Sequence, residues 1–149
     1  MSLVRREIAE AMARRYEYFS TFAGSPVSAV AALATMDVLE DQRLPHRALR
    51  TGRYLRSELR AYGSTVDWIG SVRGRGLLAG VEVSPSPDSG ITAKTVAEGL
   101  RRERVLIGVT GRARNVLKIR PPLVWDESHV DHLMAALRRV GSEIDGRQR

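Results

Sequence analysis

The chain has 149 residues, of which 43% are hydrophobic, and it carries a formal net charge of +7. This length and composition predict one domain with a sizeable core. The absence of cysteine excludes disulfides and thiolate metal sites, and the three histidines lack the spacing of a zinc site.

The sequence contains no apolar run long enough to cross a membrane, which takes about 18 residues. No signal peptide is visible either, because Arg5, Arg6 and Glu7 interrupt the first apolar stretch. We therefore expect a soluble, cytoplasmic protein without a membrane partner.

The positive charge raises nucleic acid as a partner, but its distribution argues against one. Only Lys94 and Lys118 are lysines, and the arginines are spread along the chain among acidic residues. They fall mostly on the polar faces of expected helices rather than in one patch. We expect no nucleic-acid partner.

Hydrophobic periodicity predicts the elements in chain order. Residues 3–15 are expected to be helical, 20–26 to form a loop, and 27–40 to form a helix that is apolar nearly all round and hence buried. The helix that follows has an expected inner stripe of Leu49, Gly52, Leu55, Leu59 and Tyr62, with Arg50, Arg53, Arg56 and Arg60 outside.

The period then changes to that of strands. The remaining elements are a strand at 66–72, a turn at 73–76, a strand at 77–83, a loop at 84–90, a helix at 92–104, a strand at 105–109, a turn at 110–115 and a strand at 116–120. Asp126 is expected to cap a last helix whose apolar stripe is Val130, Leu133, Met134, Leu137 and Ile144. This order predicts an α+β fold: a small, mostly antiparallel sheet with helices on one face, preceded by a helical arm.

Ser20 and Thr21 precede Pro26 and the apolar helix. They are typical of a helix cap or a loop hydrogen bond, and spacing alone favours this interpretation. The alternative is a phosphate contact, because hydroxyls and free backbone N–H groups near a helix N-terminus suit an anion.

Arg120 ends the strand at 116–120, directly before Pro121 and Pro122. In a strand, Leu117 and Ile119 would face the helices, and Val116, Lys118 and Arg120 the other side. A guanidinium at the rim of a sheet can bind a carboxylate through two hydrogen bonds, or it can form a surface salt bridge. The residues alone leave both alternatives open, and they show no nucleophile–base pair.

Three stretches in order resemble class III pyridoxal-phosphate aminotransferases. "YFSTFAGSPVSAV" is similar to the family's Ser-Thr-Phe-Gly-Gly-Asn-Pro segment, "IGSVRGRGLLAGVEV" to its glycine-rich hairpin, and "VLIGVTGRARNVLKIRPPLVW" to the strand pair that ends in Arg-Pro-Pro-Leu. Within the family, the third stretch is most similar to the branch that contains alanine–glyoxylate aminotransferase 2-like proteins and phospho-lyases. The chain departs from the family pattern at Ala23, Ser25 and Arg112-Ala113. These differences affect the expected substrate more than the family assignment.

The resemblance implies roles for particular residues. Thr21 with Ser20 would contact the phosphate of pyridoxal phosphate in the neighbouring subunit, and Arg120 would hold the substrate carboxylate. Residues 1–44 would be the tail of the cofactor-binding large domain with its connecting helix, and residues 45–149 the small C-terminal domain.

The resemblance also implies an absence. The family bonds its cofactor through a Schiff-base lysine that lies before the segment matching Val4, and neither Lys94 nor Lys118 matches it. We expect no catalytic residue in this chain, no cofactor bound by the chain alone, and no activity of the chain alone. The expected partners are a second copy of the chain or the missing N-terminal large domain, with a small amino or oxo acid as the substrate of the complete enzyme. The alternatives are a phospho-lyase fragment and a non-catalytic domain that binds a partner.

Overall fold

The computed structural model describes residues 4–84 and 91–146, and its internal contacts divide the chain into two compact units, Met1–Val38 and Leu39–Arg149. The predicted loop at 84–90 lies, except for Ser84, outside the described residues. The functional assignment of residues 1–44 and 45–149 to two domains stays a prediction.

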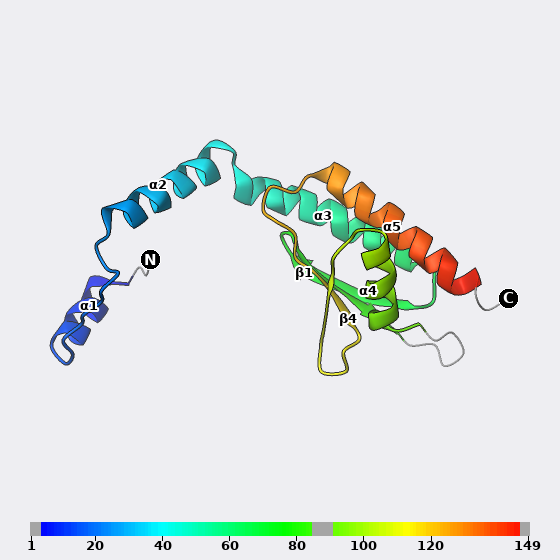
Figure 1. The fold of residues 1–149 in the computed structure, drawn as a ribbon, viewed down its shortest axis with the longest axis horizontal. Coiled ribbons are helices and arrows are strands. Elements are labelled where there is room, and N and C mark those ends of the chain that lie inside the picture. The colour runs from blue at the N-terminus through cyan, green and yellow to red at the C-terminus, as the bar shows by residue number, and fades with distance from the viewer. Residues whose placement is uncertain (1–3, 85–90, 147–149) are drawn as a thin grey trace. The chain divides into compact units, whose positions relative to one another are not determined.

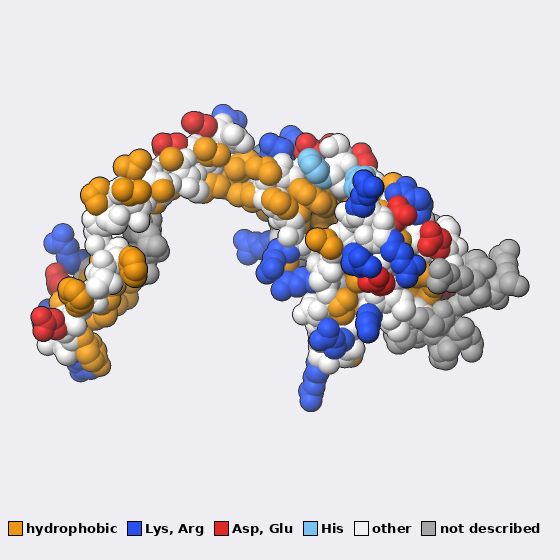
Figure 2. Space-filling view, in the orientation of Figure 1, with side chains coloured by type: hydrophobic (Ala, Val, Ile, Leu, Met, Phe, Trp, Pro, Cys, Tyr) orange, Lys and Arg blue, Asp and Glu red, His pale blue; other side chains and the backbone are white. Residues whose placement is uncertain are grey.

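The first unit is helical, as expected. Its elements are α1 (Arg6–Ala13) and most of α2 (Pro26–Asp41), which continues into the second unit. The prediction that α2 is buried is wrong for this chain by itself, because none of its residues is buried. Figure 2 shows hydrophobic side chains exposed along α2. Val27, Val30 and Leu33 are among the exposed residues of this helix. The described part of this unit contains no strand on which the helix could pack.

The second unit holds all of the sheet. Its further elements are α3 (Leu44–Gly63), β1 (Ile69–Arg75), β2 (Leu78–Val83), α4 (Ala93–Arg102), β3 (Gly108–Thr110), β4 (Val116–Ile119) and α5 (Glu127–Gly146). The strands lie in the order β1-β2-β4-β3, and every neighbouring pair is antiparallel. The first strand begins later than predicted, at Ile69, and a register shift between Ile69 and Val72 marks a bulge.

One face of the sheet forms the core. Ala79 pairs with Ile119 and Val81 with Leu117, so these four side chains share a face, and each is buried. They belong to one hydrophobic cluster with side chains of α3, α4 and α5. Figure 1 shows the three helices on the same side of the strands. The predicted α+β fold, with a small antiparallel sheet and helices on one face, is confirmed.

Helix α3 shows where the predicted stripe was right and where it was not. Gly52, Leu55, Leu59 and Tyr62 are buried, but Leu49 is 49% exposed. At about 100° per residue, the stripe continues from Leu55 to Ala48, and Leu49 lies a further 100° round the helix. Ala48 therefore takes the place that was expected for Leu49.

Two side-chain contacts tie α3 to its neighbours. The hydroxyl of Tyr54 donates to Asp131 of α5 over 2.7 Å, and this bond to a carboxylate raises the pKa of Tyr54 to about 12. Arg56, which was expected outside the core, is half-buried and donates to the carbonyl of Gly76 at the tip of the β1–β2 hairpin over 2.6 Å.

The hairpin tip lies directly against the backbone of α3. A Cβ atom added to Gly52 would lie 1.8 Å from the carbonyl oxygen of Gly76, far inside van der Waals contact. Gly76 itself has a φ of 53°, in the left-handed region that favours glycine. The close approach therefore requires glycine on the helix and glycine in the turn.

Replacing Gly52 by alanine is expected to destabilise the second unit by about 2–3 kcal/mol, because the added methyl group must displace the hairpin. Gly108→Ala is the matched control, since a Cβ there would meet its nearest atoms at 3.9 Å. Urea unfolding of both variants checks the prediction, and equal midpoints would show that the hairpin yields without cost.

Candidate functional site

Ser20 and Thr21 lie in the turn that joins α1 to α2. The Ala23 backbone N–H donates to the carbonyl of Ser20, and Gly24 has a φ of 73°. Ser20 is half-buried and Thr21 is exposed. Neither hydroxyl makes a hydrogen bond to a residue in the described parts of the chain.

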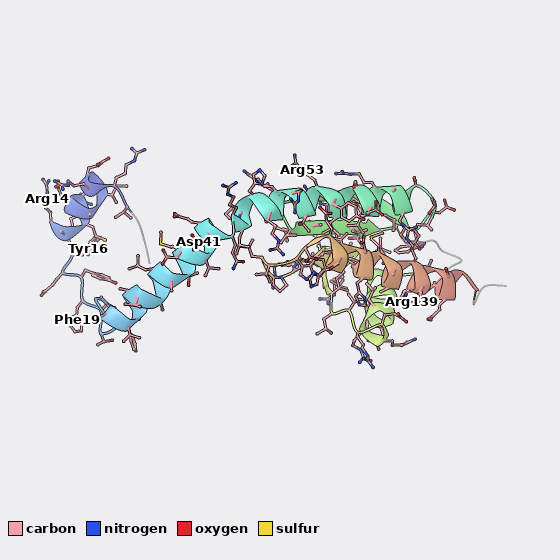
Figure 3. The ribbon with its side chains drawn as sticks, turned by 90° about the horizontal axis from the view of Figure 1, so that it is seen from above. Arg14, Tyr16, Phe19, Asp41, Arg53 and Arg139 are labelled. Atoms are coloured by element: carbon pink, nitrogen blue, oxygen red, sulfur yellow. The ribbon has the colours of Figure 1, made fainter. Side chains whose placement is uncertain are left out.

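The same turn borders a cavity of about 1260 Å3 that belongs entirely to the first unit. Its walls are mostly apolar and include Met12, Tyr16 and Phe22, whereas Ser20, Ser25 and Ser28 contribute hydroxyls. Figure 3 shows Tyr16 and Phe19 in the segment between the two helices. Ser20 is thus the one of the two predicted phosphate contacts that lines the cavity.

The start of α2 adds a partial positive charge at this place. Helix N-termini carry free N–H groups, of which the Ser28 N–H is directed at the Ser25 hydroxyl over 3.4 Å. With the free hydroxyls of Ser20 and Thr21, this turn has the donors that a phosphate group requires. Among the described residues, no lysine or arginine lines the cavity, and Glu17 does. The lining side chains would therefore not neutralise the charge of a phosphate, and the Glu17 carboxylate would repel it.

Arg120 lies in the second unit, one residue beyond β4 rather than at its last position as predicted. Its side chain is exposed and forms no ion pair or hydrogen bond with any described residue. The surface salt bridge that the sequence left open is therefore absent within residues 4–84 and 91–146, and the guanidinium is available to an anion.

The loop after Arg120 is held on both sides. Arg47 of α3 donates to the carbonyl of Val124 over 2.7 Å and lies 3.8 Å from the carboxylate of Asp126. Trp125 stacks on His129 with ring centroids 5.7 Å apart. These contacts fix the loop between the first turn of α3 and the first turn of α5.

Asp126 is the N-cap of α5, as predicted. Its Oδ1 accepts from the backbone N–H and hydroxyl of Ser128 and lies 2.7 Å from Nδ1 of His129. The Ser128 hydroxyl, followed by the His129 ring and backbone, holds the pKa of Asp126 well below its usual range. The charged form of this carboxyl thus stabilises the start of the helix.

Lys118 is a second cation that the sequence analysis placed on the open face without a role. It is half-buried on β4 and pairs with Gly80 of β2 and Gly108 of β3. Because both residues paired with Lys118 are glycines, no side chain lies directly opposite it on either neighbouring strand. This could not be predicted from the sequence, because it depends on knowing which residues pair. Val116, expected on the same open face, is nevertheless buried because it packs against Gly80 and Gly111.

The turn that carries Ser20 and Thr21 and the residue Arg120 belong to different compact units. Among the described residues no group of three or more potential metal ligands occurs, and no described helix is long and apolar enough to cross a bilayer.

Comparison with known proteins yields one family. The family model of class III aminotransferases matches residues 1–140. The chain is 38% identical over 135 residues to a mitochondrial alanine–glyoxylate aminotransferase 2 homolog of Arabidopsis thaliana, covering 88% of this chain and 28% of that protein. It is 30% identical to an ethanolamine-phosphate phospho-lyase homolog of Caenorhabditis elegans, covering 91% of this chain and 30% of the relative.

Solved structures agree with the sequence relatives. A phospholyase from Arthrobacter, determined with phosphoethanolamine, superposes with a TM-score of 0.82 at 35% identity, over 91% of this chain and 33% of that one. An acetylornithine aminotransferase from Elizabethkingia anophelis superposes with a TM-score of 0.75 at 31% identity, over 86% of this chain and 31% of that one. The chain thus spans less than a third of the length of the two curated relatives.

Replacing Asp126 by alanine is expected to lower the melting temperature by several degrees at neutral pH, because the cap and its charge are lost. The depressed pKa stabilises the fold above the unfolded value of about 4, and this contribution disappears as the pH falls through the lower folded value. The difference between variant and parent should therefore narrow below about pH 4.

Thermal melts at neutral and acidic pH check this prediction. Asp67→Ala is the control, because Asp67 is exposed and has no partner among the described residues. A difference that stays constant between neutral pH and pH values below about 4 would show that the Asp126 charge is not the stabilising element.

Proposed function

Because the chain belongs to the class III aminotransferase family, we propose that it supplies one side of the active site of a pyridoxal-phosphate-dependent aminotransferase. The reaction would move an amino group between an amino donor and a 2-oxo acid. The observation that carries the proposal is that a family match over residues 1–140 includes a turn with two hydroxyls and an arginine that have no hydrogen-bonding or ionic partner among the described residues.

Each of these groups has a role that its surroundings support. The hydroxyls of Ser20 and Thr21, next to the N-terminus of α2, would donate hydrogen bonds to the cofactor phosphate. Arg120 would hold the substrate carboxylate with two parallel hydrogen bonds, and the anchored loop behind it would fix its direction. Pyridoxal phosphate, when bound, supplies the electron sink for the reaction.

The cofactor has support among the structural neighbours. An amine transaminase from an uncultivated Pseudomonas species, which shares the fold with a TM-score of 0.78, was determined in its PLP-bound form. Because no lysine of this chain matches the one that the family bonds to its cofactor, we propose that another polypeptide segment provides that amine. The chain alone would then bind no cofactor covalently and would be inactive.

The exposed apolar side chains of α2 support a partner for the first unit. A band of exposed hydrophobic residues on one helix is typical of an interface. We propose that a large domain or a second copy of the chain covers it. We also propose that the protein is located in the cytoplasm.

A phospho-lyase is the second candidate, favoured by the similarity to the Arthrobacter enzyme and to the Caenorhabditis relative. In that case the anion held by the chain would be a phosphate rather than a carboxylate. A non-catalytic domain that only binds a partner remains the alternative from another class.

The chain alone should form no stoichiometric lysine adduct when it is incubated with pyridoxal phosphate and reduced with borohydride. Intact-mass spectrometry measures the adduct, and a coupled assay measures transamination. One site-specific adduct on Lys94 or Lys118 together with turnover would refute the proposal that the catalytic amine comes from elsewhere.

In the enzyme assembled from this chain and its large domain, Arg120→Gln is expected to raise the KM of the amino donor about tenfold, because a charge-assisted contact is lost. Thr21→Val should instead weaken the affinity for pyridoxal phosphate by about tenfold. Arg53→Gln is the control, since Arg53 projects from α3 away from α5 (Figure 3). Turnover of ethanolamine phosphate without transamination would select the phospho-lyase alternative.

A further inference from the structure

A second, smaller cavity lies wholly within the second unit. Its volume is about 170 Å3, and it opens between the residues before β3, the loop after β4 and α5. The walls include Leu106, Ile107, Arg120, Pro121, Trp125 and Leu133. All of these side chains except that of Arg120 are predominantly apolar, so the cavity offers a nonpolar interior beside one cation.

The volume limits the ligand. An apolar protein cavity of about 150 Å3 holds one benzene molecule, so this cavity accepts a group of roughly six carbon atoms. It is smaller than the pockets of about 300–1,000 Å3 that hold cofactors and drug-sized molecules. A short aliphatic or phenyl group fits, whereas a nucleotide or pyridoxal phosphate does not.

The polarity adds a second requirement. Arg120 contributes to the lining and has no ionic or hydrogen-bonding partner among the described residues. Leu106 at the same cavity is 87% exposed, so an apolar group placed against it would remove nonpolar surface from water. The cavity thus combines a place for an anion with a place for a hydrocarbon group.

The wall formed by the loop after β4 is fixed before any ligand arrives. The Trp125 backbone N–H donates to the carbonyl of Pro122 over 3.1 Å, and the Trp125 ring stacks on His129. Arg47 holds the adjoining carbonyl of Val124 over 2.7 Å. Such pre-organisation lowers the entropy that binding would otherwise cost.

We propose that this cavity is a subsite for the side chain of the substrate, and that it selects carboxylates that carry an apolar group of about four to six carbons. Arg120 binds the carboxylate at the rim, and Leu106, Pro121 and Trp125 surround the hydrocarbon group. The inference rests on the proposed role of Arg120 and adds the class of substrate to it. It places phosphoethanolamine, which has no such group, among the poor ligands.

Phenylacetate tests the inference on the chain alone, with nitrogen-15 NMR of the two tryptophan indoles as the readout. We expect saturable shifts of the Trp125 indole and of the Leu106 amide, with a dissociation constant of roughly 1 mM for a ligand of about ten non-hydrogen atoms. The Trp68 indole, buried in the core, should not move. Phenylethanol, the neutral analogue, should bind about tenfold more weakly, and acetate and phosphoethanolamine should not saturate.

Two variants separate the parts of the subsite. Arg120→Gln should bring phenylacetate and phenylethanol to the same affinity. Leu106→Trp places a larger side chain at the mouth of the cavity and should weaken the binding of both ligands. Because Leu106 is exposed, this substitution leaves the core in place. Arg53→Gln is the matched control and should bind like the parent chain.

The inference is overturned if phenylacetate produces no saturable shift, if the shifts lie away from Trp125, or if Arg120→Gln keeps the preference for the carboxylate. Binding by the chain without turnover by the assembled enzyme would support the cavity and count against the proposed function. Turnover of apolar amino acids that is unaffected by Leu106→Trp would leave the proposed function intact and reject the subsite.

Discussion

The close contact between Gly52 and Gly76 fixes how α3 and the sheet are combined. It brings the backbone of a helix against the tip of a hairpin, which no residue with a side chain would permit at Gly52. Arg56 then reaches the Gly76 carbonyl, and Arg60 lies 3.3 Å from the carbonyl of Val72. With the hairpin fixed on α3, the apolar face of β2 and β4 meets α4 and α5, and the loop after β4 can be held by Arg47.

The two candidate binding places differ in what surrounds them. Arg120 follows a strand of a packed sheet, and its loop is fixed by a side chain from α3 and by a helix cap. Ser20 and Thr21 lie in a turn between two helices without buried residues. The surroundings of Arg120 are thus pre-organised by the core of this chain, whereas the turn with Ser20 and Thr21 has no buried core beneath it.

The order and type of the elements in the sheet-bearing unit were predictable because strong periodicity and local signals agree there. The apolar run that contains β2, the cap at Asp126 and the stripe from Gly52 to Tyr62 are local properties of the sequence. Boundaries that depend on tertiary contacts were less accurate: β1 begins after buried Trp68, and Arg120 falls just beyond its strand. The exposure of α2 in this chain could not be predicted. An apolar composition indicates that the helix surface is normally covered, but it does not indicate which chain covers it. The roles of Ser20, Thr21 and Arg120 likewise came from the resemblance and not from their spacing.

Every buried hydrophobic residue in the described chain belongs to the second unit. That unit therefore holds the buried core of the described chain, whereas α2 keeps its apolar side chains exposed. A subunit that has folded but not yet assembled would keep this helix available to chaperones and proteases. If the proposed partner covers this helix, the amount of the protein in a cell would depend on the supply of that partner.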